Sequence, residues 1–197
     1  RGRDILHMEA TGRSISAFDW FFKVRDRYET YMDADGVFPW VFVRRVNEGG
    51  YEISQDYTFY QHTESVKTEE GKSYEVPLGI QDMLSSFYYA RTIDFSNAKE
   101  GDIFQFDCFV DEEVFPLMIK YLGEETIDTR LGEFDCLKFV PVVQEGRIFS
   151  DEEDMLVWIT NDENKIPVLA EAQILVGSIK MELMEYSGLA NEISKVE

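Results

Sequence analysis

Residues 77–95 read PLGIQDMLSSFYYARTIDF, and their spacing sets them apart from the strand-like sequence on either side. Apolar side chains recur at intervals of three and four residues, which predicts a helix over about residues 80–91 with one apolar stripe. Pro77 and Gly79 mark its start, and Asp82 places a carboxylate near the positive end of the helix dipole. Because sheet is the available partner, we expect the stripe to lie against it. Its members are Ile80, Met83, Leu84, Phe87 and Tyr88.

The rest of the chain consists of short runs of alternating polar and apolar residues, separated by turn residues. About a dozen such runs are typical of antiparallel hairpins. A sheet of that length curls or splits rather than staying flat. The sequence therefore predicts a single mainly β domain over residues 1–197, an antiparallel meander curled into a partly closed barrel. A two-sheet sandwich is the alternative, and in either case the one principal helix would cover the concave side or an open end.

Individual segments give more specific expectations. The alternation that begins at Phe18 predicts one long strand to about Tyr31, and Asp33 and Gly36 fit the hairpin turn that follows. Pro39 in the next run indicates an edge strand or a bulge. Four further expectations concern longer ranges: little pattern in residues 1–13, separate strands over 114–122 and 124–129, a mobile polar loop over 144–153, and a tail or short helix over 187–197.

The charge of the chain argues against several partners. With 39 acidic and 19 basic residues the formal net charge is −20, and such a field repels phosphate backbones and anionic lipid headgroups. The most basic run, residues 23–27, is diluted by neighbouring acids and is interpreted as a solvated strand face. We therefore expect no nucleic-acid partner. No apolar run reaches the roughly 18 residues of a membrane-spanning helix, so we also expect no integral membrane segment.

Catalytic and metal-binding signatures are not found in the sequence. The nucleophile, dinucleotide, phosphate-loop and zinc-protease motifs do not occur. His7 and His62 are interpreted as unrelated surface residues, and Cys108 and Cys136 as two buried free thiols, with one disulfide as the alternative. The acidic turn after residue 32 lacks the ligand spacing of a calcium loop. We predict no catalytic residue, no metal site and no cofactor. The acidic run 151–154 is interpreted as a solvated loop.

Arg91 is the residue of the predicted helix that is hardest to explain by packing. It falls on the apolar stripe rather than on the polar side. One interpretation is that its guanidinium caps the helix or pairs with Asp94. The other is that it faces a cavity, where it could hold a carboxylate, phosphate or sulfate. On the second interpretation the candidate ligand-binding residues are Arg91, Tyr88, Phe87 and Met83.

Several segments together resemble an uncharacterised family of exported bacterial proteins, the domain of unknown function 3108. Residues 82–91, DMLSSFYYAR, resemble its D-x-L-S-x-x-Y-x-x-R segment, and residues 132–138, GEFDCLK, its G-x-F-x-x-x-K hairpin. WITND at 158–162, Pro167 and GSI at 177–179 follow in the family's order. The resemblance implies a β-rich secreted or periplasmic protein made with an N-terminal signal. It implies no established activity. Because the chain begins Arg-Gly rather than Met, we expect that an upstream signal has been removed.

Three functions follow from these observations. The first is a non-enzymatic periplasmic or cell-envelope protein that binds a lipid or another amphipathic small molecule in the concave face of a curved sheet. The second is a structural or adaptor protein of the envelope that binds another protein, through the acidic surface and residues 144–154. The third is a hydrolase of envelope glycans acting through paired carboxylates, for which no motif is present.

Overall fold

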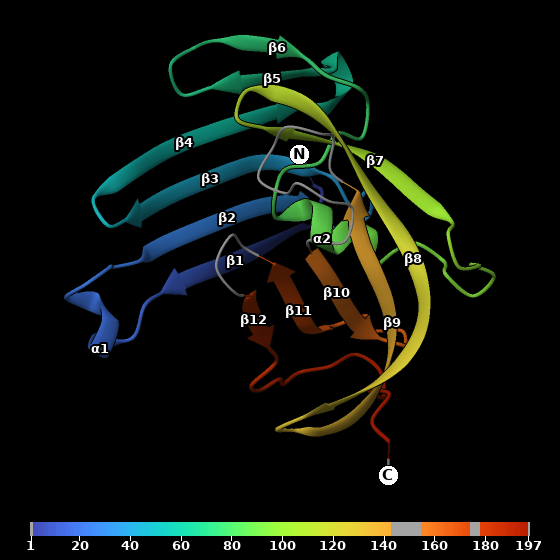
Figure 1. The fold of residues 1–197 in the computed structure, drawn as a ribbon. Helices are drawn as coiled ribbons and strands as arrows, with labels where there is room; N and C mark the ends of the chain where they lie inside the picture. The colour runs from blue at the N-terminus through green and yellow to red at the C-terminus, as the bar shows by residue number, and fades with distance from the viewer. Residues whose placement is uncertain (1, 143–154, 174–177, 197) are drawn as a thin grey trace. The chain divides into compact units, whose positions relative to one another are not determined.

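The computed structural model describes residues 2–142, 155–173 and 178–196. Its strands form two six-stranded antiparallel sheets, one in the order β1-β2-β3-β4-β5-β6 and one in the order β12-β11-β10-β9-β8-β7 (Figure 1). The predicted mainly β class is confirmed, but the strands described do not close into one barrel, and the two-sheet alternative fits them. The strands of the first sheet are β1 Ile5–Arg13, β2 Arg25–Asp33, β3 Pro39–Glu48, β4 Tyr51–Tyr60, β5 Ser65–Thr68 and β6 Ser73–Glu75. Those of the second are β7 Ile103–Val110, β8 Glu113–Thr129, β9 Gly132–Val142, β10 Met155–Thr160, β11 Pro167–Gln173 and β12 Ser178–Glu182.

The chain divides into two compact units that both draw on separate stretches of sequence. The first unit comprises Arg1–Ile93 and Phe106–Pro116, and the second comprises Asp94–Gln105 and Leu117–Glu197. The tip of the β7–β8 hairpin therefore belongs to the first unit. The single domain over residues 1–197 stays a prediction.

An aromatic core fills the inner face of the first sheet. Thr30, Phe42 and Tyr57 are paired across β2, β3 and β4 and are all buried, so they share that face. The ring of Phe109, from the β7–β8 hairpin, contacts this face and makes an edge-on contact with Tyr57 at 5.2 Å between ring centroids. Hydrophobic burial of rings at this density is the main stabilising contribution in the unit. The buried cluster consists of Phe42, Tyr57, Phe59, Val66, Val76, Ile80 and Phe109.

The principal helix is shorter than the predicted range of residues 80–91. Helix α2 covers Ser85–Ala90. The backbone of Gln81 accepts a hydrogen bond from the amide of Phe109 at 2.8 Å and donates one to Asp107 at 2.9 Å, as in a strand pair. Because the amide and the carbonyl of Gln81 are both hydrogen-bonded to the neighbouring hairpin, the helix can begin only after residue 81.

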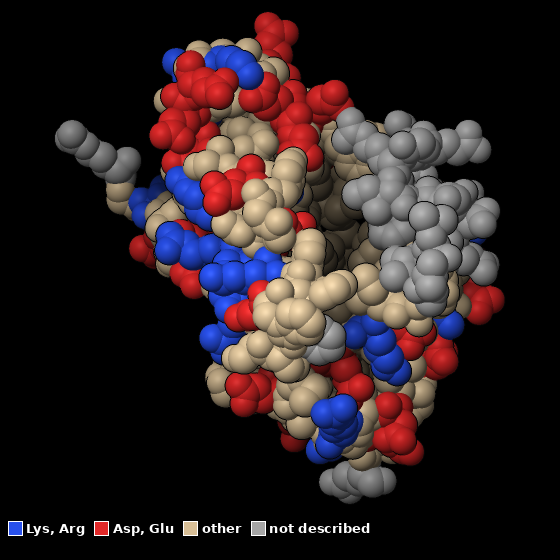
Figure 2. Space-filling view, turned by 60° about the vertical axis from the view of Figure 1, so that its left-hand side comes forward, with Lys and Arg blue, Asp and Glu red and all other residues tan. Residues whose placement is uncertain are grey.

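The predicted strand over residues 18–31 is wrong in its first half. Helix α1, Ser16–Asp19, lies there, and β2 begins only at Arg25. The loop between them is held at its base, because the amide of Ser14 bonds to the carbonyl of Val24 at 3.3 Å and the amide of Gly49 to that of Lys23 at 2.9 Å. Residues 20–22 are therefore displayed in solvent rather than paired in the sheet. In Figure 2 an uncharged protrusion stands here beside a band of Lys and Arg side chains.

In three other segments the structure can be compared with the sequence analysis, and two of the three expectations are wrong. Residues 1–13, where little pattern was expected, contain β1. The separate strands predicted over 114–122 and 124–129 are one strand, β8, interrupted by a bulge at Gly123, whose φ of +107° suits glycine. The bulge expected at Pro39 is confirmed, since the register of β2 on β3 shifts there.

The core of the second unit is closed by the C-terminal tail, whose described residues, 187–196, form no helix. Phe134, Cys136 and Trp158 are buried on one face of the second sheet, and Ile193 of the tail packs against them. Asp162 fastens the tail, because one of its oxygens accepts the amide of Ser194 at 2.7 Å. Its other oxygen accepts the amides of Asn164 and Lys165 and the hydroxyl of Thr160.

We expect Asp162→Ala to lower the free energy of unfolding by about 2 kcal/mol, because it leaves several donors without an acceptor. The amides of residues 194–196 should also exchange faster with solvent. Denaturant unfolding and hydrogen exchange measure the two effects. The exposed neighbour Glu163→Ala is the control and should change neither. Unchanged exchange at the tail in Asp162→Ala would contradict this account of how the tail is held.

Candidate functional site

The segment that leads into α2 is anchored by a buried carboxylate. Asp82 has no exposed surface. Its Oδ1 accepts the backbone amides of Leu84 at 2.8 Å and Ser85 at 2.7 Å, so it caps the first turn of the helix. Its Oδ2 accepts the hydroxyl of Thr30 on the inner face of the first sheet. The side chain that caps the helix therefore also fixes it to β2.

Burial gives Asp82 an unusual protonation equilibrium. Removal from water raises the pKa of Asp82 to about 6, although the hydrogen bonds from Thr30, Ser85 and Leu84 act in the opposite direction. Burial, together with the Asp82 charge, raises the pKa of the Cys108 thiol to about 12. Cys108 is therefore a packed thiol at neutral pH and not a nucleophile.

The second cysteine behaves in the same way. Cys136 is buried and free, and burial raises the pKa of its thiol to about 12. Both cysteines are free, which confirms the interpretation as buried thiols rather than a disulfide.

Of the four residues predicted to bind a ligand, Phe87 and Tyr88 lie in α2, Met83 precedes the helix and Arg91 follows it directly. Met83 is partly buried and packs against the aromatic core, whereas Phe87 leaves 58% of its surface in solvent. Tyr88 is partly buried, and the guanidinium of Arg91 lies over its ring at 5.5 Å from the centroid. The structure therefore brings Tyr88 and Arg91 together as a cation–π pair.

The helix buries two serines, whereas the sequence predicts that its aromatic side chains are buried. The side chains of α2 that are buried are Ser85 and Ser86, and the predicted stripe is not buried along its whole length. The hydroxyl of Ser86 donates to the carbonyl of Met83 at 2.8 Å, so its polar group is satisfied locally. Small residues let the helix approach the sheet closely, and this turns Phe87 outward. Periodicity missed this because a six-residue helix need not follow a stripe defined over twelve residues.

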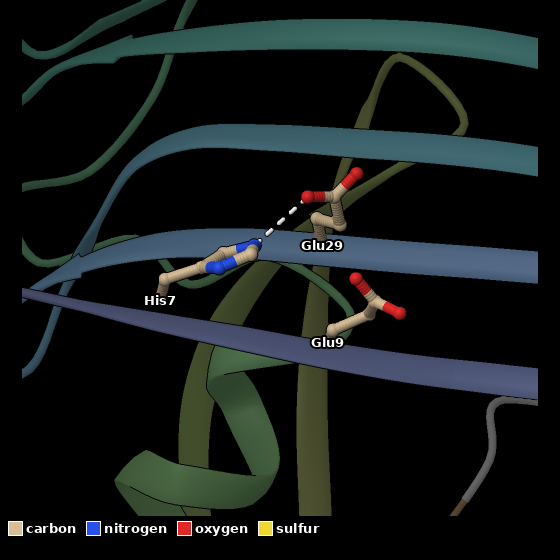
Figure 3. Close-up of side chains that lie close together, drawn as sticks. All are labelled: His7, Glu9 and Glu29. Atoms are coloured by element: carbon tan, nitrogen blue, oxygen red, sulfur yellow. Dashed lines mark hydrogen bonds and ion pairs between the residues drawn. The ribbon is translucent and has the colours of Figure 1, made fainter.

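A second polar cluster lies on the opposite face of the first sheet. Figure 3 shows the imidazole of His7 and the carboxylates of Glu9 and Glu29 on the same side of β1 and β2, with their ligand atoms within 4.8 Å of one another. A nitrogen and two carboxylates form a ligand set that suits a transition metal. However, Glu29 already accepts hydrogen bonds from His7 at 2.8 Å and from Arg27.

The charge of Glu29 is thus compensated within the protein. Burial alone would raise the pKa of Glu29, but the hydrogen bonds from His7 and Arg27 hold it below its usual value. We interpret the cluster as an ion-pair network of the sheet surface. The sequence signal for this cluster is the spacing of His7 and Glu9, which places both side chains on one face only if residues 5–13 form a strand. His62 lies elsewhere, against the ring of Trp40.

In the second unit, two motif residues meet on the sheet. Lys138 and Trp158 are paired across β9 and β10, and the ammonium of Lys138 lies 5.0 Å from the centroid of the indole. Both side chains bond to Glu125, the indole at 2.9 Å and the ammonium at 3.0 Å. These contacts stabilise the sheet surface. The acidic run 151–154 lies outside the described residues.

These features define an antiparallel β protein whose polar clusters satisfy structural needs, and among the described residues no helix is long and apolar enough to cross a membrane. The sequence model of the family "Protein of unknown function (DUF3108)" matches residues 1–184, so the chain belongs to that family. The resemblance found in the sequence is confirmed. The comparison with curated proteins gave no match.

The comparison with solved structures found two proteins that are likewise named after domains of unknown function. One is the beta-barrel-like protein of domain of unknown function DUF1849 from Brucella abortus, with 12% identity and a TM-score of 0.55 over 83% of this chain and 73% of that chain. The other is a DUF1089 family protein from Pseudomonas aeruginosa, with 13% identity and a TM-score of 0.43 over 82% of this chain and 87% of that chain. The first likeness concerns the fold alone.

We expect Asp82→Asn to remove one component of the pH dependence of stability. A raised pKa means that the folded state binds the proton more tightly, so this contribution is complete below the unfolded value near 3.8 and is lost as the pH rises through about 6. Relative to Asp82→Asn, the wild type should therefore lose up to about 3 kcal/mol of unfolding free energy between about pH 4 and pH 7. Urea unfolding at a series of pH values measures the difference.

The exposed Asp35→Asn is the matched control and should show the wild-type profile. The Asn side chain keeps an oxygen that can cap α2, so Asp82→Asn is expected to fold. Parallel pH profiles for the wild type and Asp82→Asn would contradict a raised pKa at this position.

Proposed function

We propose that this is a non-enzymatic exported protein of the periplasm or cell envelope that binds an amphipathic molecule along α2. The observation that carries the proposal is the exposure of Phe87 on a helix that buries two serines instead. A large ring left in water gives up the free energy that its burial would contribute, about 1.5–3 kcal/mol. A ligand with an apolar portion recovers that energy on binding.

The neighbouring side chains supply the rest of an amphipathic site. Met83 offers a flexible apolar surface that adapts to different ligand shapes. Four residues after Phe87, Arg91 carries a planar guanidinium, a group that recognises carboxylate, phosphate or sulfate. Its stacking on Tyr88 holds the guanidinium in a defined place. The four residues thus favour a molecule with an apolar chain and an anionic head.

Export is supported by the likeness of several motifs to an exported family and is part of the same proposal. Expression of the full precursor in a Gram-negative host, followed by separation of periplasm from cytoplasm, tests it. We expect the protein in the periplasmic or envelope fraction. Recovery in the cytoplasm alone would contradict the proposed location, and it would leave the ligand experiment below unaffected.

We expect the protein to bind the fluorescent fatty acid 11-(dansylamino)undecanoic acid, with the carboxylate at Arg91 and the chain against Phe87. Arg91→Ala should weaken binding about tenfold or more, since a charge-assisted hydrogen bond contributes about 1.5–3 kcal/mol. Arg91→Lys should retain part of the affinity, and Phe87→Ala should weaken binding less than Arg91→Ala does. Fluorescence titration at constant ionic strength gives each dissociation constant.

Two controls separate this site from general adhesion of the probe. Lys99→Ala removes an exposed cation, and Ile179→Ala removes an exposed apolar side chain in the second unit. Both should bind as the wild type does. Equal affinity in the wild type and Arg91→Ala would show that the helix is not the site.

A further inference from the structure

The most exposed apolar residues of the first unit are consecutive and lie in the loop between α1 and β2. Trp20 leaves 84% of its surface in solvent and Phe21 leaves 80%, and both Phe22, next to them in the chain, and Ile15, just before α1, are more than half exposed. Each such ring carries about 150–250 Å² of surface. These four residues are called the aromatic tip. Soluble proteins rarely gather large apolar side chains at one exposed place unless the place binds something.

The aromatic tip is presented by a built loop and not by a frayed end. Asp19 of α1 bonds to Arg25 at the start of β2 and accepts the hydroxyl of Ser14. Bonds between Ser14 and Val24 close the loop at its base. The exposed rings are therefore held in position at little further cost in conformational entropy.

A glycine in the neighbouring hairpin makes room for one of the rings. The ring of Phe22 lies against Gly49, where a Cβ would come within 2.5 Å of it. Phe22 thus rests on the β3–β4 turn, whereas Trp20 and Phe21 contact each other edge-on at 6.0 Å between centroids. The two side chains without such a support are the two most exposed of the three.

Basic residues surround the base of the aromatic tip. Residues 13–27 contain four basic residues against two acidic ones, a formal charge of +2 in a chain that carries −20. Arg13 is paired with Arg25, and Arg27 with Arg45, in adjacent cross-strand positions on one face of the sheet. Figure 2 shows this band of Lys and Arg beside the uncharged protrusion.

Local charge decides what approaches this end of the unit. The Debye length at physiological ionic strength is about 8 Å, so acidic residues farther away are largely screened. Arg25, Arg27 and Arg45 each pair with an acid, yet each keeps 41–54% of its side chain exposed. These cations remain able to meet phosphate groups.

From these observations we propose that the aromatic tip docks the protein on the surface of a phospholipid bilayer. Trp and Phe rings favour the boundary between headgroups and acyl chains, and Lys and Arg just behind them favour the phosphate level. A protein partner would need a larger complementary surface than these four side chains provide. Docking at the tip is a property separate from ligand binding at α2.

The test uses vesicles of phosphatidylethanolamine with phosphatidylglycerol, and vesicles of phosphatidylcholine alone. We expect the protein to sediment with the first kind and more weakly with the second, and added salt to reduce the difference. The double variant Trp20→Ser with Phe21→Ser should bind about tenfold less or weaker, because most of the inserted apolar surface is gone. Its thermal unfolding should match the wild type, since both side chains are exposed.

Further variants make the result specific to the aromatic tip. Trp20→Phe should still bind but lose the blue shift of tryptophan emission on vesicles, which assigns that signal to residue 20. Arg13→Glu with Lys23→Glu should weaken binding to the phosphatidylglycerol vesicles alone. The matched control Ile179→Ser with Met181→Ser removes two exposed apolar residues of β12 and should bind as the wild type does.

Three results of the vesicle experiments would overturn the proposal, and one result on self-association would do so as well. In the first, the wild type sediments with neither kind of vesicle. In the second, the double variant Trp20→Ser with Phe21→Ser sediments as much as the wild type. In the third, the β12 control loses as much vesicle binding as that double variant. Self-association of the wild type that is abolished by the tip variant, without vesicle binding, would assign the aromatic tip to an interface between copies and also overturn it. The tip variant should still bind the dansylated fatty acid, so failure here and failure of the proposed function are distinguishable.

Discussion

The first unit depends on the packing of one ring, that of Phe109, against the inner face of the first sheet. The strands of that sheet come from residues far earlier in the chain. That ring contacts Tyr57, Phe59 and Tyr74, which come from β4 and β6. The backbone beside it pairs with Gln81, which delays the start of α2. Consequently the same hairpin covers the core with the side chain of Phe109 and limits the start of α2 through its backbone.

The sequence predicted the strands well where alternation was regular and turn residues were clear. It failed where contacts distant in the chain override the local pattern. Residues 18–24 alternate like a strand except at Phe21, but hydrogen bonds at the base of the loop hold residues 20–22 out of the sheet. Strand β1 shows little pattern because its outer face carries the polar residues His7 and Glu9, and the partner of His7, Glu29, is supplied by β2.

The features of the candidate site also divide into those that follow from local spacing and those that follow from contacts distant in the chain. Arg91 was singled out by its position on a stripe, and its stacking on Tyr88 could be anticipated from their spacing of three residues. The outward turn of Phe87 could not, because α2 buries Ser85 and Ser86 instead, and the helix is fixed to the sheet by the bond between Asp82 and Thr30, a residue 52 positions earlier. A buried capping carboxylate with a pKa near 6 is likewise a product of tertiary burial.

The discontinuity of the first unit bears on the order in which the chain acquires its structure during synthesis. The ribosome releases residues 1–93 before the hairpin that carries Phe109 exists, and the unit is complete only once Pro116 has emerged. Until then the rings of β3 and β4 lack the side chain that covers them. The first unit therefore cannot complete its fold on the ribosome until residues well beyond its first 93 have been synthesised.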